Sequence, residues 1–300
     1  MSLLTCADMV AQCLEGQEAA WRHFITGYLP FASAVIARRH PQLASRRESL
    51  LREILLRTRD QEAQFFRDYR GQSEREFLVH LREHILRVLE EAVAQAFPVA
   101  QAFPAAQAFP VAQAFLPVPV AQAFPVAQAF LPVPVAQAFL PVLDWEAFQG
   151  ALEGFTVLER QLVWLHVLGA GAPEVAAILR IEPATAEGVL GRARQALPAL
   201  ADNRPALIRG ARAGAGKECP EGPAFIRLLG GQNTWRDRQE LEQHLSGCWR
   251  CIDLLCRLRE VDYLARGAEP LPEAERLACF KALGLEEPRA PVWKRLLAAG

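Results

Sequence analysis

A proline-punctuated repeat in the middle of the chain sets the strongest limit on how the sequence can fold. "VAQAF" or "AAQAF" begins at positions 93, 99, 105, 111, 120, 126 and 135, so the period is six residues with two nine-residue steps. Each Pro removes a backbone donor and pushes the preceding residue out of the α region. We expect residues 93–143 to form an extended linker. A tandem expansion of an existing linker explains this repeat better than a Phe-bearing arm that binds a partner.

The rest of the 300 residues is long enough for two or three small domains. The formal net charge is −1, so no overall positive field indicates nucleic acid or a membrane surface. The long uncharged stretch coincides with the repeat and contains too many prolines for a membrane-spanning helix. No signal-peptide pattern stands at the N-terminus, and we expect a cytoplasmic protein. In that reducing compartment the seven cysteines are thiols or metal ligands rather than disulfides.

Residues 1–92 predict a first domain made only of helices. "SLLREILLRT" (49–58) and "SEREFLVHLREHILRVLEE" (73–91) both place apolar residues at helical spacing. Ser73 followed by Glu76 is a capping-box signature at the start of the second segment. With helices also expected in both segments after the repeat, the predicted fold class is all-α.

Residues 144–210 predict a second helical domain that contains a helix-turn-helix. A first helix carries Leu158, Leu162, Leu165 and Val167. Gly169 and Gly171 break it, and Pro173 opens a second helix, "PEVAAILR". A third helix follows "EPAT" and turns Val189, Leu190, Ala193 and Leu197 inward. Helices of these lengths suit a motif that lays its last helix in the major groove of DNA.

The segment "PEVAAILRIEPATAEGVLGRAR" resembles the promoter-reading domain of extracytoplasmic-function sigma factors. The blocks "EAAWRHFITGYLPFASAVIARR", "SLLREILLRT" and "FFRDYRGQSEREFLVHLREHILRVLEE" look like the first domain of the same family, in the right order. The resemblance implies that residues 1–92 dock on core RNA polymerase and open the promoter −10 element. It also implies that residues 144–210 approach the −35 element of promoter DNA.

In the first domain, the resemblance implies that Leu51, Glu53 and Ile54 contact polymerase. Glu53 is kept, but the family's Asp and Gln fall on Ser49 and Arg52 in this chain. In the −10 block, positions that usually include a basic residue and Asn fall on residues 86 and 87, a leucine and an arginine.

In the third helix of the helix-turn-helix, the resemblance implies DNA contacts by Thr185, Arg192 and Arg194, together with Arg87 of the first domain. Where the family often has Lys and Arg, this chain has Glu187 and a valine. A carboxylate facing phosphates repels them, and lost cations remove the counterion release that supports affinity. We therefore expect the DNA contacts to be weak.

Residues 211–300 contain the pattern H-x3-C-x2-C, formed by His244, Cys248 and Cys251. A C-x2-C turn brings two thiolates to one ion, and a histidine one helical turn earlier lies on the same side. Tetrahedral zinc needs a fourth ligand, for which Cys219 and Cys256 are the two candidates; Cys219 fits better. Ordinary buried thiols beside a surface histidine remain the alternative.

This pattern resembles the zinc-binding anti-sigma fold, whose members clamp a sigma factor and cover its polymerase surfaces. The resemblance implies that zinc is structural, or redox-sensitive through its thiolates. Fusion of such a domain to a sigma-like body suggests control within one chain, by an intramolecular sigma/anti-sigma contact. The amphipathic stretch "EAERLACFKALGL" (273–285) either docks on the N-terminal body or is a solvated tail.

Two further patterns are weak candidates for sites. "GARAGAGKE" (210–218) lacks the spacing and the Ser or Thr of a phosphate loop, so we expect a flexible joint. His80 and His84 lie one turn apart, but no third ligand is near them in the sequence, and we expect them to be solvated. No catalytic grouping stands out, and we expect no enzyme.

The predicted function is transcription initiation, tuned by the fused zinc domain. The alternative is a zinc-dependent protein-interaction module with a degenerate sigma body that does not bind DNA.

Overall fold

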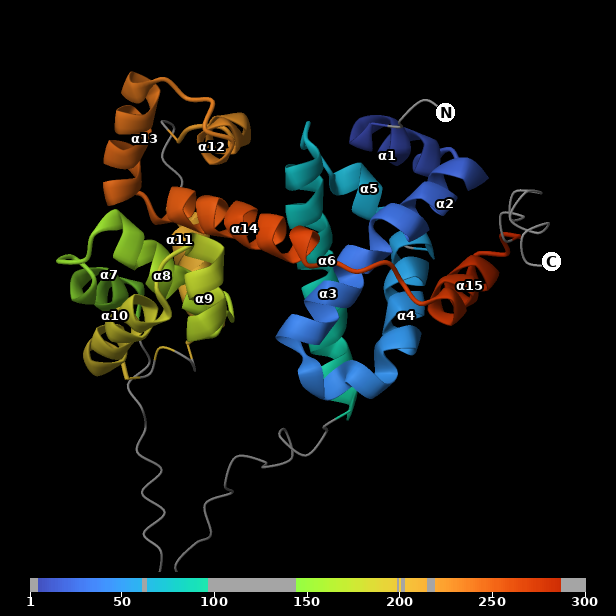
Figure 1. Cartoon of the computed structure of the whole chain (residues 1–300), viewed down its shortest axis with the longest axis horizontal. Helices are drawn as coiled ribbons and strands as arrows, with labels where there is room; N and C mark the ends of the chain where they lie inside the picture. The colour runs from blue at the N-terminus through green and yellow to red at the C-terminus, as the bar shows by residue number, and fades with distance from the viewer. Residues whose placement is uncertain are drawn as a thin grey trace, which may run out of the picture.

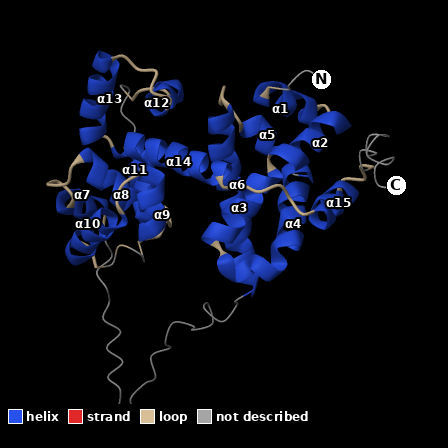
Figure 2. Cartoon of the chain, in the orientation of Figure 1, coloured by secondary structure: helices blue, strands red, loops and turns tan. Residues whose placement is uncertain are grey.

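The computed structural model describes residues 5–60, 64–96, 144–198, 200, 203–214 and 219–286. All regular elements in these ranges are helices, and no strand occurs in them, as Figure 2 shows. The predicted all-α fold class is confirmed. The repeat lies outside the described residues from Phe97 to Leu143, so its extended form stays a prediction.

The N-terminal body packs its helices around a core rich in aromatic rings. Its elements are α1 (Cys6–Leu14), α2 (Glu18–Gly27), α3 (Leu29–Arg39), η1 (Pro41–Arg46), α4 (Arg47–Asp60), α5 (Gln64–Asp68) and α6 (Glu74–Ala96). The rings of Phe24 and Phe77 are buried and lie 6.4 Å apart, edge to face. Such contacts stabilise a core beyond the area they bury.

Helix α6 begins where the capping box predicts. The Glu76 carboxylate accepts from the Ser73 backbone N–H at 3.1 Å, and the Ser73 hydroxyl accepts from the Glu76 N–H at 3.3 Å. The helix ends at Ala96, four residues into the predicted linker. Ala and Gln are good helix formers, and the first proline comes only at Pro98, so the first repeat copy continues the helix.

The two histidines of α6 are packed rather than solvated, so that expectation was wrong. His84 is 4% exposed, and its Nε2 lies 3.4 Å from the Thr58 hydroxyl. The His80 ring stacks on Phe65, with its Nε2 2.7 Å from the Phe65 carbonyl oxygen. Helix α5 covers this face of α6, which single-helix periodicity does not reveal.

The helix-turn-helix body forms around α8 (Val157–Val167), α9 (Ala172–Leu179) and α10 (Pro183–Ala196). Arg180 ends α9 in the left-handed region at φ 56°, which turns the chain into α10. The four predicted inward residues of α10 and its end, residues 189, 190, 193 and 197, are all buried. Helices α7 (Trp145–Ala151) and α11 (Arg204–Ala213) complete this body, and α11 runs across the predicted boundary at residue 210.

The C-terminal part does not form a separate lobe. Helices α12 (Gly222–Leu229) and α13 (Trp235–Gly247) lie at one end, and α14 (Trp249–Arg266) runs from them between the other two bodies (Figure 1). Helix α14 packs on α3 and α6 on one side and on α8, α9 and α11 on the other. Helix α15 (Glu273–Ala282) packs on α2 and α4, so of the two alternatives left open for this stretch the structure shows docking on the N-terminal body.

Candidate metal centre

Four predicted ligands meet where α12, α13 and α14 come together. His244 stands in the last turn of α13, which a Thr234–Asp237 capping box starts. Cys248 ends α13 and begins α14 with extended backbone, φ −119° and ψ 101°, so the two helices turn sharply at this residue. Cys251 follows in the first turn of α14, and Cys219 precedes α12. The H-x3-C-x2-C residues therefore lie at the sharp turn between α13 and α14.

The four ligand atoms lie close together around one point. The Sγ atoms of Cys219 and Cys248 lie 3.6 Å apart, and Nε2 of His244 lies 3.1 Å from Sγ of Cys251. All four ligand atoms lie within 4.8 Å of one another. With bonds of about 2.0–2.3 Å, the N and S ligands of one zinc ion stand about 3.5–3.8 Å apart. The group is thus close enough to bind a metal ion.

The structure decides between the two candidates for the fourth ligand. Cys219 belongs to the group, whereas Cys256 is fully buried with its Sγ 3.7 Å from the Gln161 carbonyl oxygen. Burial and the neighbouring Cys248 and Cys219 thiols raise the pKa of the Cys251 thiol. Without a cation the Cys251 thiol is therefore protonated, and metal binding must release its proton.

The metal group is joined to the core of the helix-turn-helix body by Trp249. This residue lies between the ligands Cys248 and Cys251, and its ring is buried against Phe148 and Trp164, with centroids 5.0 and 5.7 Å away. The Arg160 guanidinium lies over the same ring, 5.7 Å from its centroid. A metal ion that orders the turn between α13 and α14 would therefore fix the position of the start of α14 relative to this body.

One turn into α14, a buried carboxylate joins it to α8 and α11. Asp253 is 0% exposed; it accepts from Nε1 of Trp164 at 2.9 Å and from Arg257 at 2.5 Å. Nε of Arg212 on α11 lies 3.5 Å from the same carboxylate. Glu83 of α6 pairs with both arginines at 2.6 Å, so the network reaches the N-terminal body.

A second buried carboxylate, one heptad further along α14, joins it to the N-terminal body. Glu260 is 0% exposed, and its Oε1 accepts from Nε and Nη2 of Arg39 at 3.0 and 2.6 Å. Its Oε2 lies 2.7 Å from Nη2 of Arg82 on α6. Arg39 also donates to Glu174 of α9 at 2.5 Å. One carboxylate thus holds α3 and α6, and through Arg39 also α9.

Sequence reasoning missed Asp253, Glu260 and their arginine partners, because charged residues within a helix usually face water. One signal for them exists in "CIDLLCRLREVDYL" (251–264), where apolar residues surround the helix on more than one face. Such a helix is buried on several sides, and its acids then need partners.

Two of the three predicted polymerase-contact residues are inside the N-terminal body. Leu51 and Ile54 are 0% exposed, because the apolar stripe of α4 faces the core. Glu53 reaches the surface, where it pairs with Arg57 at 2.6 Å. Helix α15 covers part of α4, with ion pairing between Arg47 and Glu275. In this arrangement only Glu53 of the three is open to a partner.

The predicted DNA-contact residues do not form one cationic surface. Thr185 and Arg194 are exposed on α10, but Arg192 pairs with Glu159 and lies over the Phe155 ring. Glu187 is exposed beside them. Arg87 lies on α6 of the other body, at a cavity between the bodies.

Comparison with protein-family models, with curated proteins and with solved structures finds no match for this chain. In the part of the chain that the structure describes, none of the helices is both long and apolar enough to cross a membrane.

Proposed function

We propose that this chain is a sigma-factor-like regulator of transcription initiation whose fused C-terminal part binds structural zinc and holds the sigma-like bodies together. The observation that carries the proposal is the course of α14. It begins at the Cys3His group and runs between the two bodies, with buried carboxylates at residues 253 and 260 bound to both. A domain that controls its own chain must make such contacts.

Zinc fits the group better than other common ions. Three thiolates and one imidazole are soft and borderline ligands, which zinc prefers in a closed tetrahedral shell. Four protein ligands leave no open position for substrate, so the role is structural. Thiolate ligands can also be oxidised, which would release the ion and free the start of α14.

Contacts of α15 support control within one chain. The helix covers α4, the helix that the family resemblance assigns to polymerase binding. The Arg59 guanidinium donates to the Leu283 carbonyl oxygen at 3.0 Å, and the Arg22 guanidinium lies over the Phe280 ring. Polymerase would then have to displace α15 to reach this surface of α4.

A second function is favoured by the surface of α10. Its exposed face has Glu187, and one of its two arginines is bound to Glu159. A surface that repels phosphates and has few unpaired cations favours a protein-interaction module that does not bind DNA.

Binding to duplex DNA separates the two functions. The measurement is fluorescence anisotropy of a labelled duplex, titrated with the full chain at several salt concentrations. A sigma-like regulator predicts binding that weakens with salt and is lost further in an Arg194→Gln variant. The interaction module predicts no binding at any salt concentration.

A further inference from the structure

An open apolar groove of about 530 Å³ lies between α1 and α5 of the N-terminal body. The two helices contact each other at the end of this body that lies away from the helix-turn-helix body (Figure 1). On α1 the groove is lined by one stripe at helical spacing, made of Ala7, Val10, Ala11 and Leu14. Phe66 of α5 lines the opposite wall. Apolar stripes of this kind pack against another element, so the groove has the form of a seat for one more helix.

The stripe is open to solvent. Leu14 is 40% exposed, and Ala7 and Ala11 are exposed as well. Among the described residues only three large apolar side chains are exposed to this degree, and Leu14 is the one that lines a groove with other apolar residues. The two alanines are small, so a second helix can approach α1 closely along the stripe.

Opposite charges stand on the two edges of the groove. Arg67 and Arg70 line it on the α5 side, and within the described ranges neither guanidinium pairs with a carboxylate. Asp8 and Glu15 are exposed on α1. Each follows a residue of the stripe, and one residue turns a helix by about 100°, so both carboxylates lie on the edge of the stripe away from α5.

We propose that this groove is a self-association surface, in which α1 packs against α1 of a second copy of this chain about a two-fold axis parallel to the helix. Such an axis exchanges the two edges of the stripe, so the acidic edge of each copy faces the arginine edge of the other. A two-fold axis across the helix would make the pair antiparallel and would bring like charges together. Charge complementarity therefore selects both the occupant and its direction.

The positions along the groove give the facing charges the same register. The Phe66 ring lies 5.6 Å from the Trp21 ring, near the start of α2, which begins three residues after Glu15. Arg67, next to Phe66, therefore lies toward the end of α1 that carries Glu15. A two-fold axis parallel to α1 keeps each residue at its own height, so Glu15 of one copy faces Arg67 of the other.

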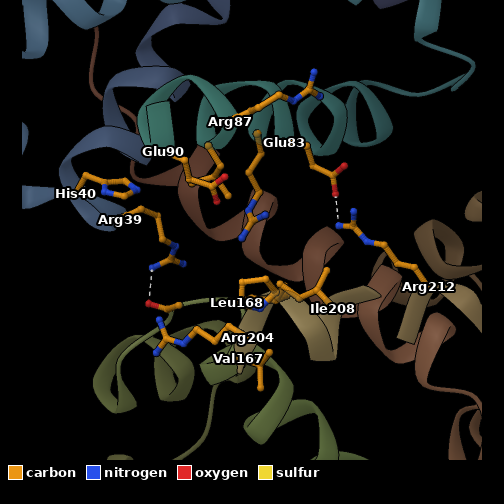
Figure 3. A pocket seen from close by; sticks show the side chains of 14 residues that line it. Arg39, His40, Glu83, Arg87, Glu90, Val167, Leu168, Arg204, Ile208 and Arg212 are labelled. Carbon is orange, nitrogen blue, oxygen red and sulfur yellow. Dashed lines mark hydrogen bonds and ion pairs between the residues drawn. The ribbon is translucent and has the colours of Figure 1, made fainter. Parts of the chain in front are cut away.

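The larger cavity between the N-terminal body and the helix-turn-helix body offers no comparable surface. Figure 3 shows Arg212 paired with Glu83 at this cavity, and both Arg39 and Arg82 are held by Glu260. These charges already have partners within the chain. The charged edges of the groove between α1 and α5 form no ion pairs among the described residues, so they remain available to a second copy.

The contact is small, because it is built on a helix of 9 residues. Interfaces that bury less than about 1,200 Å² in total belong to weak, transient complexes. We therefore expect a dimer that forms only as the concentration rises, and that weakens with added salt because its charge pairs lie at the rim. This inference does not depend on the proposed transcription function.

The test is sedimentation velocity of the metal-loaded full chain at low salt, from about 5 to about 500 μM. The variants are Leu14→Gln, Arg67→Glu and Glu15→Arg. The matched control is Leu158→Gln on α8, where the leucine is 43% exposed outside the groove. All four side chains are exposed, so circular dichroism and Tm should stay close to those of the wild type.

The wild type should change from monomer to dimer, and each of the three groove variants should dimerise at least about tenfold more weakly. The control should stay within about twofold of the wild type. An equimolar mixture of Arg67→Glu with Glu15→Arg should dimerise within about threefold of the wild type, because opposite charges again face each other at both edges.

A wild type that stays monomeric at every concentration overturns the proposal, also when the groove binds a different protein. Dimerisation that Leu14→Gln leaves unchanged would show that another surface is used, and it overturns the proposal too. A mixture of the two charge variants that associates no better than either variant alone contradicts the parallel arrangement.

Discussion

Replacing Glu260 by Gln tests whether the buried carboxylate joins α14 to the N-terminal body. The substitution keeps the shape of the side chain and removes its charge. Arg82, 3% exposed, then loses its only carboxylate partner among the described residues, whereas Arg39 keeps Glu174. Removing one partner from a buried ion pair costs about 3–5 kcal/mol. Because Arg39 stays paired and the amide oxygen still accepts hydrogen bonds, we expect a loss of about 3 kcal/mol in the free energy of unfolding.

The assay is urea denaturation followed by far-UV circular dichroism, with metal-loaded protein. The matched control is Glu240→Gln on α13, where the ion pair with Arg236 has side chains that are 84% and 64% exposed. An exposed pair contributes little, so the control should lose less than about 0.5 kcal/mol. If unfolding has two steps, the loss caused by Glu260→Gln should fall in the step that separates the bodies. Equal, small losses for the two variants would refute the account of Glu260.

Three more outcomes follow from the structure. Cys251→Ser should abolish the bound zinc that elemental analysis detects at about one ion per chain, whereas Cys256→Ser should keep it. Gly210→Ala should cost about 1–3 kcal/mol in urea denaturation, because the added Cβ would meet a tryptophan ring at 2.6 Å. Gly150→Ala, with nothing within 4 Å, should not lower stability. Burial, and after it neighbouring charges, lower the pKa of His84 from 6.5 to about 4. Between these pH values the unfolded chain binds a proton that the folded chain does not, so the free energy of unfolding should fall by roughly 2–3 kcal/mol as pH decreases; a His84→Gln variant should show a smaller fall.

Local patterns in the sequence predicted helix α6 and three metal ligands, because both depend on residues that are close together in the chain. Apolar spacing and the Ser73–Glu76 capping box located α6, since both depend on residues within one or two turns. The H-x3-C-x2-C spacing located three of the metal ligands for the same reason. Cys219 lies 25 residues before His244, and the sequence alone does not decide between it and Cys256 as the fourth ligand. The fold places Cys219 in the group.

Long-range packing explains what the sequence could not predict. The partners of Asp253 and Glu260 come from helices up to 221 residues away, as for Arg39 and Glu260. No local pattern encodes such a distance. The burial of Leu51, Ile54 and His84 follows in the same way from the neighbours that cover each helix, which periodicity alone does not identify.

The most direct test of control within one chain is capture of core RNA polymerase by the immobilised protein. Metal-loaded wild type, the same protein after chelation, and the Glu260→Gln variant would be compared at equal loading. If the fused part restrains a sigma-like body, the wild type should capture little polymerase, and chelation and Glu260→Gln should each increase capture several-fold, roughly fivefold or more for a coupling of 1 kcal/mol. Absence of capture in all three would contradict the account, and equal capture in all three would show that the C-terminal part does not control this binding.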